Sequence, residues 1–246
     1  MRHVLLVALL AVPSAAQAQT AWTDHARVSI NFGLEQPPST TFAGTTTIAP
    51  VYLETATVNT SYGVSSGKSF DGGVLIRVAG GFGVGAAVSS FTKSQTAAVT
   101  GTIPHPFFFN TLRPISGTSS SLERSETAIH IQAGYVISSK RVDVAITGGP
   151  SFFNVSQDLV ADATYTEAYP YDTTTFSATT ISKATATKLG FNVGADIGVK
   201  LSKNVGVGGL VRFSRASVTF PLARTTSGVT TDVGGPQVAG GVRFFF

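Results

Sequence analysis

Three histidines follow the first 18 residues, and their side chains are the ones best suited to acid–base chemistry: His25, His105 and His130. Glu126 lies four residues before His130 on the same expected strand face. A hydrolase that activates a serine would need its histidine and carboxylate in contact. On a strand these two lie roughly 13 Å apart, so the spacing favours an interior polar role for His130. The histidines form no cluster with metal-ligand spacing, and we expect no metal and no cofactor.

The sequence Gly81-Phe82-Gly83-Val84-Gly85-Ala86 contains the glycine spacing G-x-G-x-x-A of dinucleotide-binding loops. Such a loop must open a helix. The following residues, Val-Ser-Ser-Phe-Thr-Lys, have the character of a strand. We therefore interpret the glycines as a turn followed by small interior residues.

Strict alternation of apolar and polar residues predicts the elements that position these side chains. From Lys188 to Leu201, KLGFNVGADIGVKL, every odd position is apolar and every even one is polar or glycine. This period of two is typical of a strand with two different faces. The same pattern predicts eight strands in all, near 27–35, 70–78, 82–88, 129–137, 142–147, 188–201, 205–213 and 237–246.

The predicted connections alternate between short and long. Tight turns are expected at 79–81, 138–141 and 202–204, and long Thr-, Ser-, Gly- and Pro-rich connections at about 36–68, 94–124, 156–186 and 221–235. Parts of the long connections are expected to continue the strands. This alternation places all long connections at one end and both termini at the other.

The polar face decides what surrounds the strands. On 188–200 it carries glycine at 190, 194 and 198, between charged and amide residues. Glycine weakens a solvent-facing strand without gain, whereas inside a narrow barrel it makes room for long side chains. The sequence therefore predicts a closed, eight-stranded antiparallel transmembrane up-and-down barrel, all-β, with a polar filled interior. The expected interior charged and titratable residues are Arg27, Glu35, Asp71, Arg77, Lys93, Glu126, His130, Asp143, Lys188, Asp196, Lys200, Arg212 and Arg243.

The register of one hairpin can be predicted in detail. The turn 202–204 places Leu201 opposite Val205, so paired residue numbers sum to 406. Gly194 then lies opposite Arg212, with Asp196 one diagonal step away. We expect Asp196 and Arg212 to form an ion pair, and the interior charges to form a plug rather than a conduit.

The N-terminal residues MRHVLLVALLAVPSAAQAQ combine a short polar start, an apolar run and the small residues Ala16-Gln17-Ala18. This is the pattern of a secretory signal peptide over residues 1–18, cleaved near Ala18, followed by one barrel domain over 19–246. Beyond it no apolar run reaches 18 residues, so a helical span is not expected. The chain has no cysteine and a formal net charge of +4 without a basic run, which gives no indication of nucleic-acid binding.

The signal peptide, the eight alternating strands, the short turns and the C-terminal aromatic strand together resemble the small eight-stranded outer-membrane barrels, the broad group of outer membrane proteins A, X and W and the opacity proteins. The apolar face of the last strand consists of Val238, Gly240, Val242, Phe244 and Phe246. The resemblance implies that the barrel-assembly machinery recognises Val238, Val242, Phe244 and Phe246.

The resemblance also implies a monomer in the bacterial outer membrane, surrounded by outer-membrane lipid and lipopolysaccharide. We expect no enzymatic activity, and a role in envelope structure and in surface interaction with an extracellular ligand through the long loops. The aromatic groups Phe107-Phe108-Phe109 and Tyr165, Tyr169 and Tyr171 are open to two interpretations, a girdle or a binding surface. A narrow channel for small hydrophobic or ionic solutes is the alternative. A lipid-modifying enzyme is disfavoured, because Ile131 and Gln132 follow His130 where a lipid A deacylase would have H-x-S.

Overall fold

The computed structural model describes residues 22–221 and 228–246, so the predicted signal peptide lies outside the described residues. The described chain contains ten antiparallel strands and no helix long and apolar enough to cross a membrane. The strands are β1 (Ala26–Glu35), β2 (Thr41–Val51), β3 (Glu54–Gly63), β4 (Gly67–Ala79), β5 (Phe82–Pro104), β6 (Leu112–Ser138), β7 (Val142–Glu167), β8 (Thr174–Lys200), β9 (Val205–Phe220) and β10 (Val229–Phe245).

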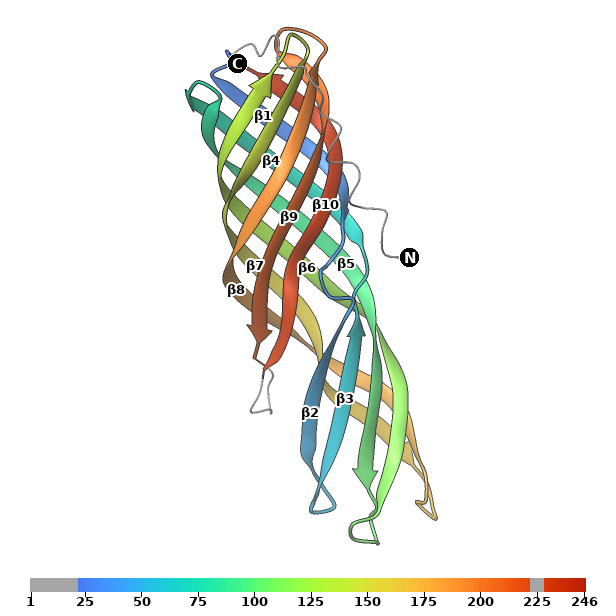
Figure 1. Cartoon of the computed structure of the whole chain (residues 1–246). Helices are drawn as coiled ribbons and strands as arrows, with labels where there is room; N and C mark the ends of the chain where they lie inside the picture. The colour runs from blue at the N-terminus through green and yellow to red at the C-terminus, as the bar shows by residue number, and fades with distance from the viewer. Residues whose placement is uncertain (1–21, 222–227) are drawn as a thin grey trace, which may run out of the picture.

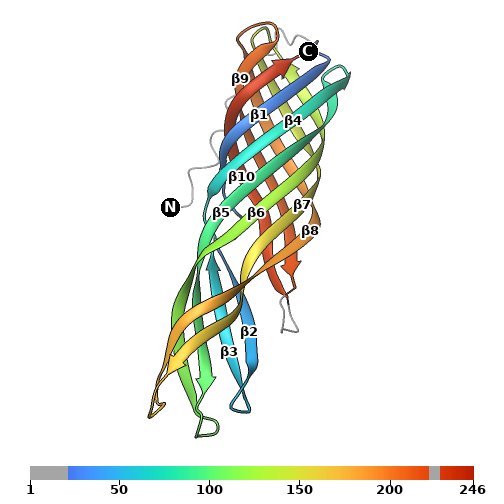
Figure 2. The same cartoon turned by 180° about the vertical axis from the view of Figure 1, so that it is seen from behind.

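Eight of these strands form a closed ring in the order β1-β4-β5-β6-β7-β8-β9-β10. The ring closes where β10 pairs with β1, from Arg27↔Phe245 to Glu35↔Gln237. Figure 2 shows the wall formed by β1, β4, β5 and β6, which are hydrogen-bonded neighbours. The predicted eight-stranded antiparallel barrel is confirmed. Closure satisfies the backbone of every ring strand, which a membrane requires.

The tight turns 80–81, 139–141 and 201–204 lie at the end of the barrel that holds the C-terminus, as predicted (Figure 1). Three of the four predicted long connections are instead mostly strand. The segment 36–68 contains the hairpin β2–β3, while 94–124 and 156–186 are continuations of β5 to β8. These segments are rich in Thr, Ser and Val, and Thr and Val favour extended backbone.

A β-bulge helps to explain why alternation missed these continuations. Ser121 has a φ of 61°, and the β5–β6 register shifts between Gln95 and Ala97. The extra residue changes which numbers face inward on β6: buried positions are even from Leu122 onward and odd before it. A strict period of two therefore breaks at this point.

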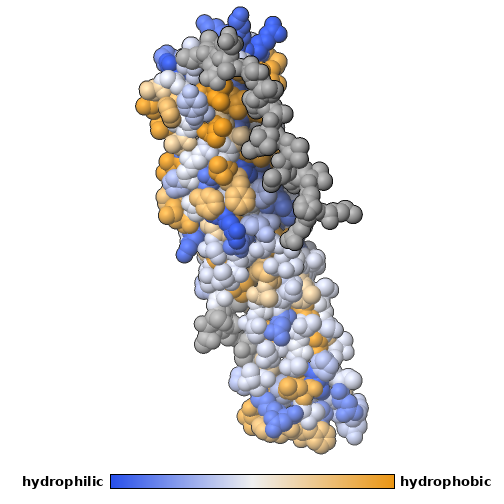
Figure 3. All heavy atoms as spheres, viewed as in Figure 1, coloured by the Kyte–Doolittle hydropathy of each residue, from blue (hydrophilic) through white to orange (hydrophobic). Residues whose placement is uncertain are grey.

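Residues 41–63, 94–123 and 156–187 form what we term the distal extension, below the barrel in Figure 1. In the barrel, apolar side chains such as Phe32, Val84 and Ile197 are exposed on the outer face, while polar side chains are buried inside. In the extension the polarity is inverted. Figure 3 shows apolar side chains over the barrel and paler surface over most of the extension. This inversion is expected where lipid is replaced by water.

Two apolar clusters fill the extension. The first, which we term the apolar layer, lies next to the barrel interior and includes Phe42, Tyr62, Leu122, Val155, Leu159, Phe220 and Val229. The second lies farther out and includes Val58, Val99, Ile103, Ile115 and Ala163. The β7–β8 hairpin is joined to the facing strands by hydrogen bonds, for example from the Val160 amide to the Tyr62 hydroxyl (2.8 Å). The extension is therefore a folded structure with a core of its own.

Candidate functional site

The barrel interior holds most of the predicted charged residues, in successive ion-paired groups. Nearest the C-terminal end, Lys200 Nζ lies 2.6 Å from Asp24 and 3.4 Å from Asp143. Beside it, Arg243 donates to Asp196 through Nε (2.9 Å) and Nη2 (2.8 Å), and Arg27 donates to the same carboxylate. One carboxylate thus binds two guanidinium groups.

Small residues make room for these long side chains, as predicted. A Cβ on Gly198 would lie 3.1 Å from Nη2 of Arg27, and one on Gly208 would lie 3.0 Å from Nε of Arg243. The glycines on the polar face are therefore part of the packing around the ion pairs.

The predicted ion pair between Asp196 and Arg212 is wrong, although the register behind it is confirmed. Gly194 lies opposite Arg212 and Val199 opposite Val207, as the sum of 406 requires. Arg212 nevertheless forms its ion pair with Asp71 on β4, a carboxylate that also accepts a hydrogen bond from Asn31 Nδ2 (3.0 Å). The side chains meet across the lumen rather than along the neighbouring strand.

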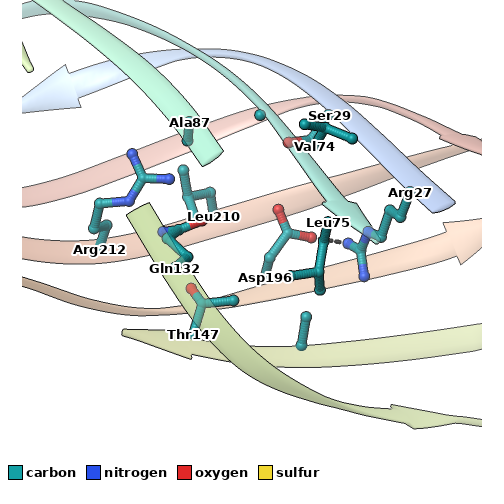
Figure 4. Close-up of a pocket in the computed structure, with 12 residues that line it drawn as sticks. Arg27, Ser29, Val74, Leu75, Ala87, Gln132, Thr147, Asp196, Leu210 and Arg212 are labelled. Carbon is teal, nitrogen blue, oxygen red and sulfur yellow. Dashed lines mark hydrogen bonds and ion pairs between the residues drawn. The ribbon is translucent and has the colours of Figure 1, made fainter. Parts of the chain in front are cut away.

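A cavity of about 40 Å³ lies between these two groups, lined in part by Arg27, Ser29, Gln132, Thr147, Asp196 and Arg212. Figure 4 shows Asp196 directed toward Arg27, with Arg212 at the opposite side of the cavity. The volume is enough for a few water molecules. It is a pocket within the plug.

His130 lies in an uncharged hydrogen-bond network beyond this cavity. Its Nε2 is 2.9 Å from the Ser89 hydroxyl, and its Nδ1 is 2.7 Å from the Ser151 hydroxyl. Asn192 Nδ2 donates to the same Ser151 oxygen (2.8 Å), and Gln132 Nε2 donates to Asn192 (3.0 Å). A serine–histidine contact therefore exists, but the side chains of His130 and Ser151 are fully buried. No carboxylate among the described residues hydrogen-bonds to His130, so the arrangement lacks the third member of a triad.

Glu126 belongs to a different group, as its distance from His130 along the strand predicted. It accepts from Arg124 Nε (2.6 Å) and from the Gly234 amide (2.8 Å). Arg124 also donates to the Asp232 carbonyl (2.9 Å). Glu35 is buried inside the barrel, and within the described chain it forms no ion pair.

Three predicted interior residues are placed differently from the rest. Arg77 is half-buried and donates to the Trp22 carbonyl (3.1 Å), while Lys93 is half-buried and faces Arg124 in the register. Lys188 is exposed, so its predicted interior position is wrong. The β8–β9 pairing ends at Phe191↔Arg215, and Lys188 lies beyond the point where the wall is continuous.

Sequence reasoning missed Arg124, Arg113 and Trp22. The two arginines fall in a segment, 94–124, that was predicted to be a connection. Trp22 is buried with Leu75, Val136 and Ala145 near the C-terminal end of the barrel. It precedes the first alternating residues, so no periodicity indicated it.

No protein-family model and no curated protein sequence matches the chain. Among solved structures, Neisserial surface protein A aligns with a TM-score of 0.43 and 13% identity, over 90% of this chain and 97% of that one. The outer membrane protease OmpT from Escherichia coli gives 0.49 and 7%, over 94% and 99%. The attachment invasion locus protein Ail of Yersinia pestis gives 0.37 and 11%, over 89% and 99%. All three TM-scores are below 0.5 and all three identities are below 25%, so no function and no residue role is transferred from these proteins.

The C-terminal strand has the predicted faces. Val238, Val242 and Phe246 are exposed on the outer face and Phe244 is half-buried there, while Phe245 is buried inside. The Lys200 ammonium lies 4.7 Å from the centre of the Phe245 ring. Recognition of this strand by the assembly machinery stays a prediction.

The distal tip, defined as the three turns 52–53, 105–111 and 168–173, is a second candidate site. Beneath it, Arg113 is buried, donates to the carbonyls of Tyr171 (2.9 Å) and Pro104 (2.6 Å), and lies 2.7 Å from Glu167. The Tyr52 hydroxyl donates to the same Glu167 carboxylate. These contacts join all three turns.

The contacts of Glu167 shift the pKa values of the groups beneath the tip. The hydrogen bond to Glu167 raises the pKa of Tyr52 to about 12, so the phenol stays a donor. Burial acts to raise the pKa of Glu167, but Tyr52 and Arg113 outweigh it and lower that pKa. The described residues hold no group of three or more acidic or histidine side chains arranged for a metal ion.

We expect Arg113→Ala to loosen the distal tip while the barrel remains folded. The change leaves Glu167 without its cation and two carbonyls without a buried donor, which costs roughly 1–3 kcal/mol for each unsatisfied group. Limited proteolysis of the reconstituted protein should then cleave near 105–111 or 168–173. The exposed Lys183→Ala is the matched control. Equal protease resistance of the two variants would show that Arg113 does not hold the turns together.

Proposed function

We propose that this chain is a non-enzymatic outer-membrane β-barrel, closed to solutes, that displays its distal extension outside the cell. The observation that carries this proposal is the filled interior: ion-paired groups occupy the barrel, and the apolar layer lies next to them. An eight-stranded barrel is just wide enough for side chains to fill. Conduction and interior catalysis would both need open space.

The proposed location in the outer membrane is supported by the difference in surface polarity between the barrel and the distal extension. The barrel presents apolar side chains outward over strand lengths suited to a bilayer, and the extension presents mainly Thr and Ser. Together with the predicted signal peptide, this favours insertion into a bacterial outer membrane after export. Because short turns lie at the periplasmic end of such barrels, the extension is on the outside.

A surface-interaction role is supported by the length of the distal extension and by its own apolar core. Loops on a scaffold commonly carry function. Here strands of up to 27 residues carry the turns well beyond the barrel, and a dedicated core supports them. The tip is thereby held in a defined position away from the membrane.

We expect the purified protein to show no stable single-channel steps in planar bilayers, because the ion-paired side chains of Asp196, Arg212 and Glu126 occupy the lumen. A wide porin reconstituted in parallel gives the positive control. Reproducible steps of constant size would overturn the closed barrel and favour the narrow channel. The remaining alternative, a lipid-modifying enzyme, predicts altered lipid A masses in cells that express the protein.

A further inference from the structure

The distal tip gathers exposed apolar side chains from three separate turns. Phe107, Phe108 and Phe109 are 68%, 61% and 72% exposed, Leu53 is 96% exposed and Tyr169 is 84% exposed. Soluble surfaces seldom expose this many adjacent aromatic rings without an interaction to make. The turns that carry these side chains lie outside the barrel, at the end of the molecule opposite the C-terminus (Figure 1).

The tip is built to hold these rings outward. The amides of Phe107 and Phe108 donate to His105 Nδ1 (3.1 and 3.3 Å), and the Phe107 ring lies 5.5 Å from that of Tyr171. The Asn110 amide donates to Glu54 (3.0 Å), which ties this turn to the β2–β3 hairpin. Each turn also holds a bulky or amide residue at positive φ: Tyr52 and Leu53, Asn110, and Tyr171. Such conformations persist only where surrounding contacts impose them.

The charge of the tip indicates which kind of lipid surface could accept its aromatic rings. Glu54, Glu167 and Asp172 are acidic. Arg113, the only arginine or lysine of the described tip and its flanks, is buried and paired with Glu167, and the buried His105 lies 3.9 Å from Asp172. An anionic lipid surface would therefore be repelled. A zwitterionic bilayer presents quaternary ammonium groups outermost, which carboxylates and aromatic faces attract, above a hydrocarbon region that accepts Phe and Leu side chains.

The membrane in question cannot be the one that holds the barrel. From Ser94 to Pro104, β5 runs roughly 33 Å at about 3.3 Å per residue. The rings therefore lie well away from the lipid around the barrel. A second membrane, facing the cell surface, is the lipid that they can reach.

We propose that the distal tip inserts Phe107, Phe108 and Phe109 into the interface of a facing zwitterionic, phosphatidylcholine-type bilayer. This rests on the proposed surface role and names its partner. The rings enter the headgroup–acyl boundary, as amphipathic anchors do. Glu54 and Asp172 remain among the choline groups.

The test uses the full protein in nanodiscs, mixed with labelled vesicles and separated by flotation. Wild-type protein is expected to float with pure phosphatidylcholine vesicles and less with vesicles that contain phosphatidylglycerol. The triple variant Phe107→Ser, Phe108→Ser, Phe109→Ser is expected to bind about 100-fold more weakly, which corresponds to about 2.8 kcal/mol for the three rings together. Ile181→Ser, an exposed apolar change on β8 outside the tip, is the matched control.

A second variant tests insertion independently if the triple change disturbs folding. Phe108→Trp places an indole at the tip, and its emission should shift to the blue with phosphatidylcholine vesicles while buried Trp22 gives a constant background. Tighter binding to anionic vesicles, equal binding by the triple variant, or a blue shift with soluble phosphocholine alone would each overturn bilayer insertion. If the protein does not bind phosphatidylcholine vesicles and also shows no conductance, the closed barrel remains supported and only the proposed lipid partner is wrong.

Discussion

Replacing Asp196 with alanine is expected to destabilise the barrel by about 3–5 kcal/mol, the range for breaking a buried ion pair on one side. The carboxylate accepts from Nε and Nη2 of Arg243 at 2.9 and 2.8 Å and also binds Arg27. Without it, two guanidinium groups are left adjacent in a filled lumen. The measurement is urea unfolding of the protein reconstituted in lipid vesicles.

Two comparisons separate this cause from general damage. Asp172→Ala removes a carboxylate that is 72% exposed and should change stability by no more than about 0.5 kcal/mol, as surface changes do. Adding Arg27→Gln and Arg243→Gln to Asp196→Ala removes the uncompensated charge and should recover part of the loss. If Asp196→Ala unfolds at the same urea concentration as Asp172→Ala, the ion-paired plug does not stabilise the barrel.

The ion-pair partners of Asp196 could not be predicted from the sequence, although the strand register could. A short turn and alternating faces were enough to predict the β8–β9 register, and Gly194 does lie opposite Arg212. A register describes only neighbouring strands. In a narrow closed barrel a side chain can also reach across the lumen, and Asp196 on β8 meets arginines on β1 and β10.

The ring strands were predictable because lipid outside and polar groups inside impose one unbroken alternation. The distal extension was less so, because its outer face is Thr and Ser, residues that are also common in loops. The bulge at Ser121 then shifts the inward positions on β6. Lys188 shows the reverse error, since alternation continues along β8 after the pairing with β9 has ended.

Replacing Gly241 with alanine is also expected to destabilise the barrel, at the seam where the barrel closes. A Cβ at Gly241 would lie 1.8 Å from the Ile30 carbonyl oxygen and 2.8 Å from the Asn31 Cα, both backbone atoms of β1. Backbone cannot rotate away as a side chain can. The methyl group must therefore push β10 from β1, and overpacking of this kind costs typically 1–3 kcal/mol.

The neighbouring glycine offers a control of the same size and strand. A Cβ at Gly240, on the outer face, meets only the Gly208 carbonyl oxygen, at 3.7 Å. Gly240→Ala should therefore assemble like the wild type, whereas Gly241→Ala should yield less folded barrel, seen as a weaker heat-modifiable band in gels of outer-membrane fractions, and unfold at a lower urea concentration. Because both changes add one methyl group to the same strand, helix or strand propensity cannot separate them. Equal band intensities and equal urea midpoints would mean that β1 and β10 do not approach as closely as the ring requires.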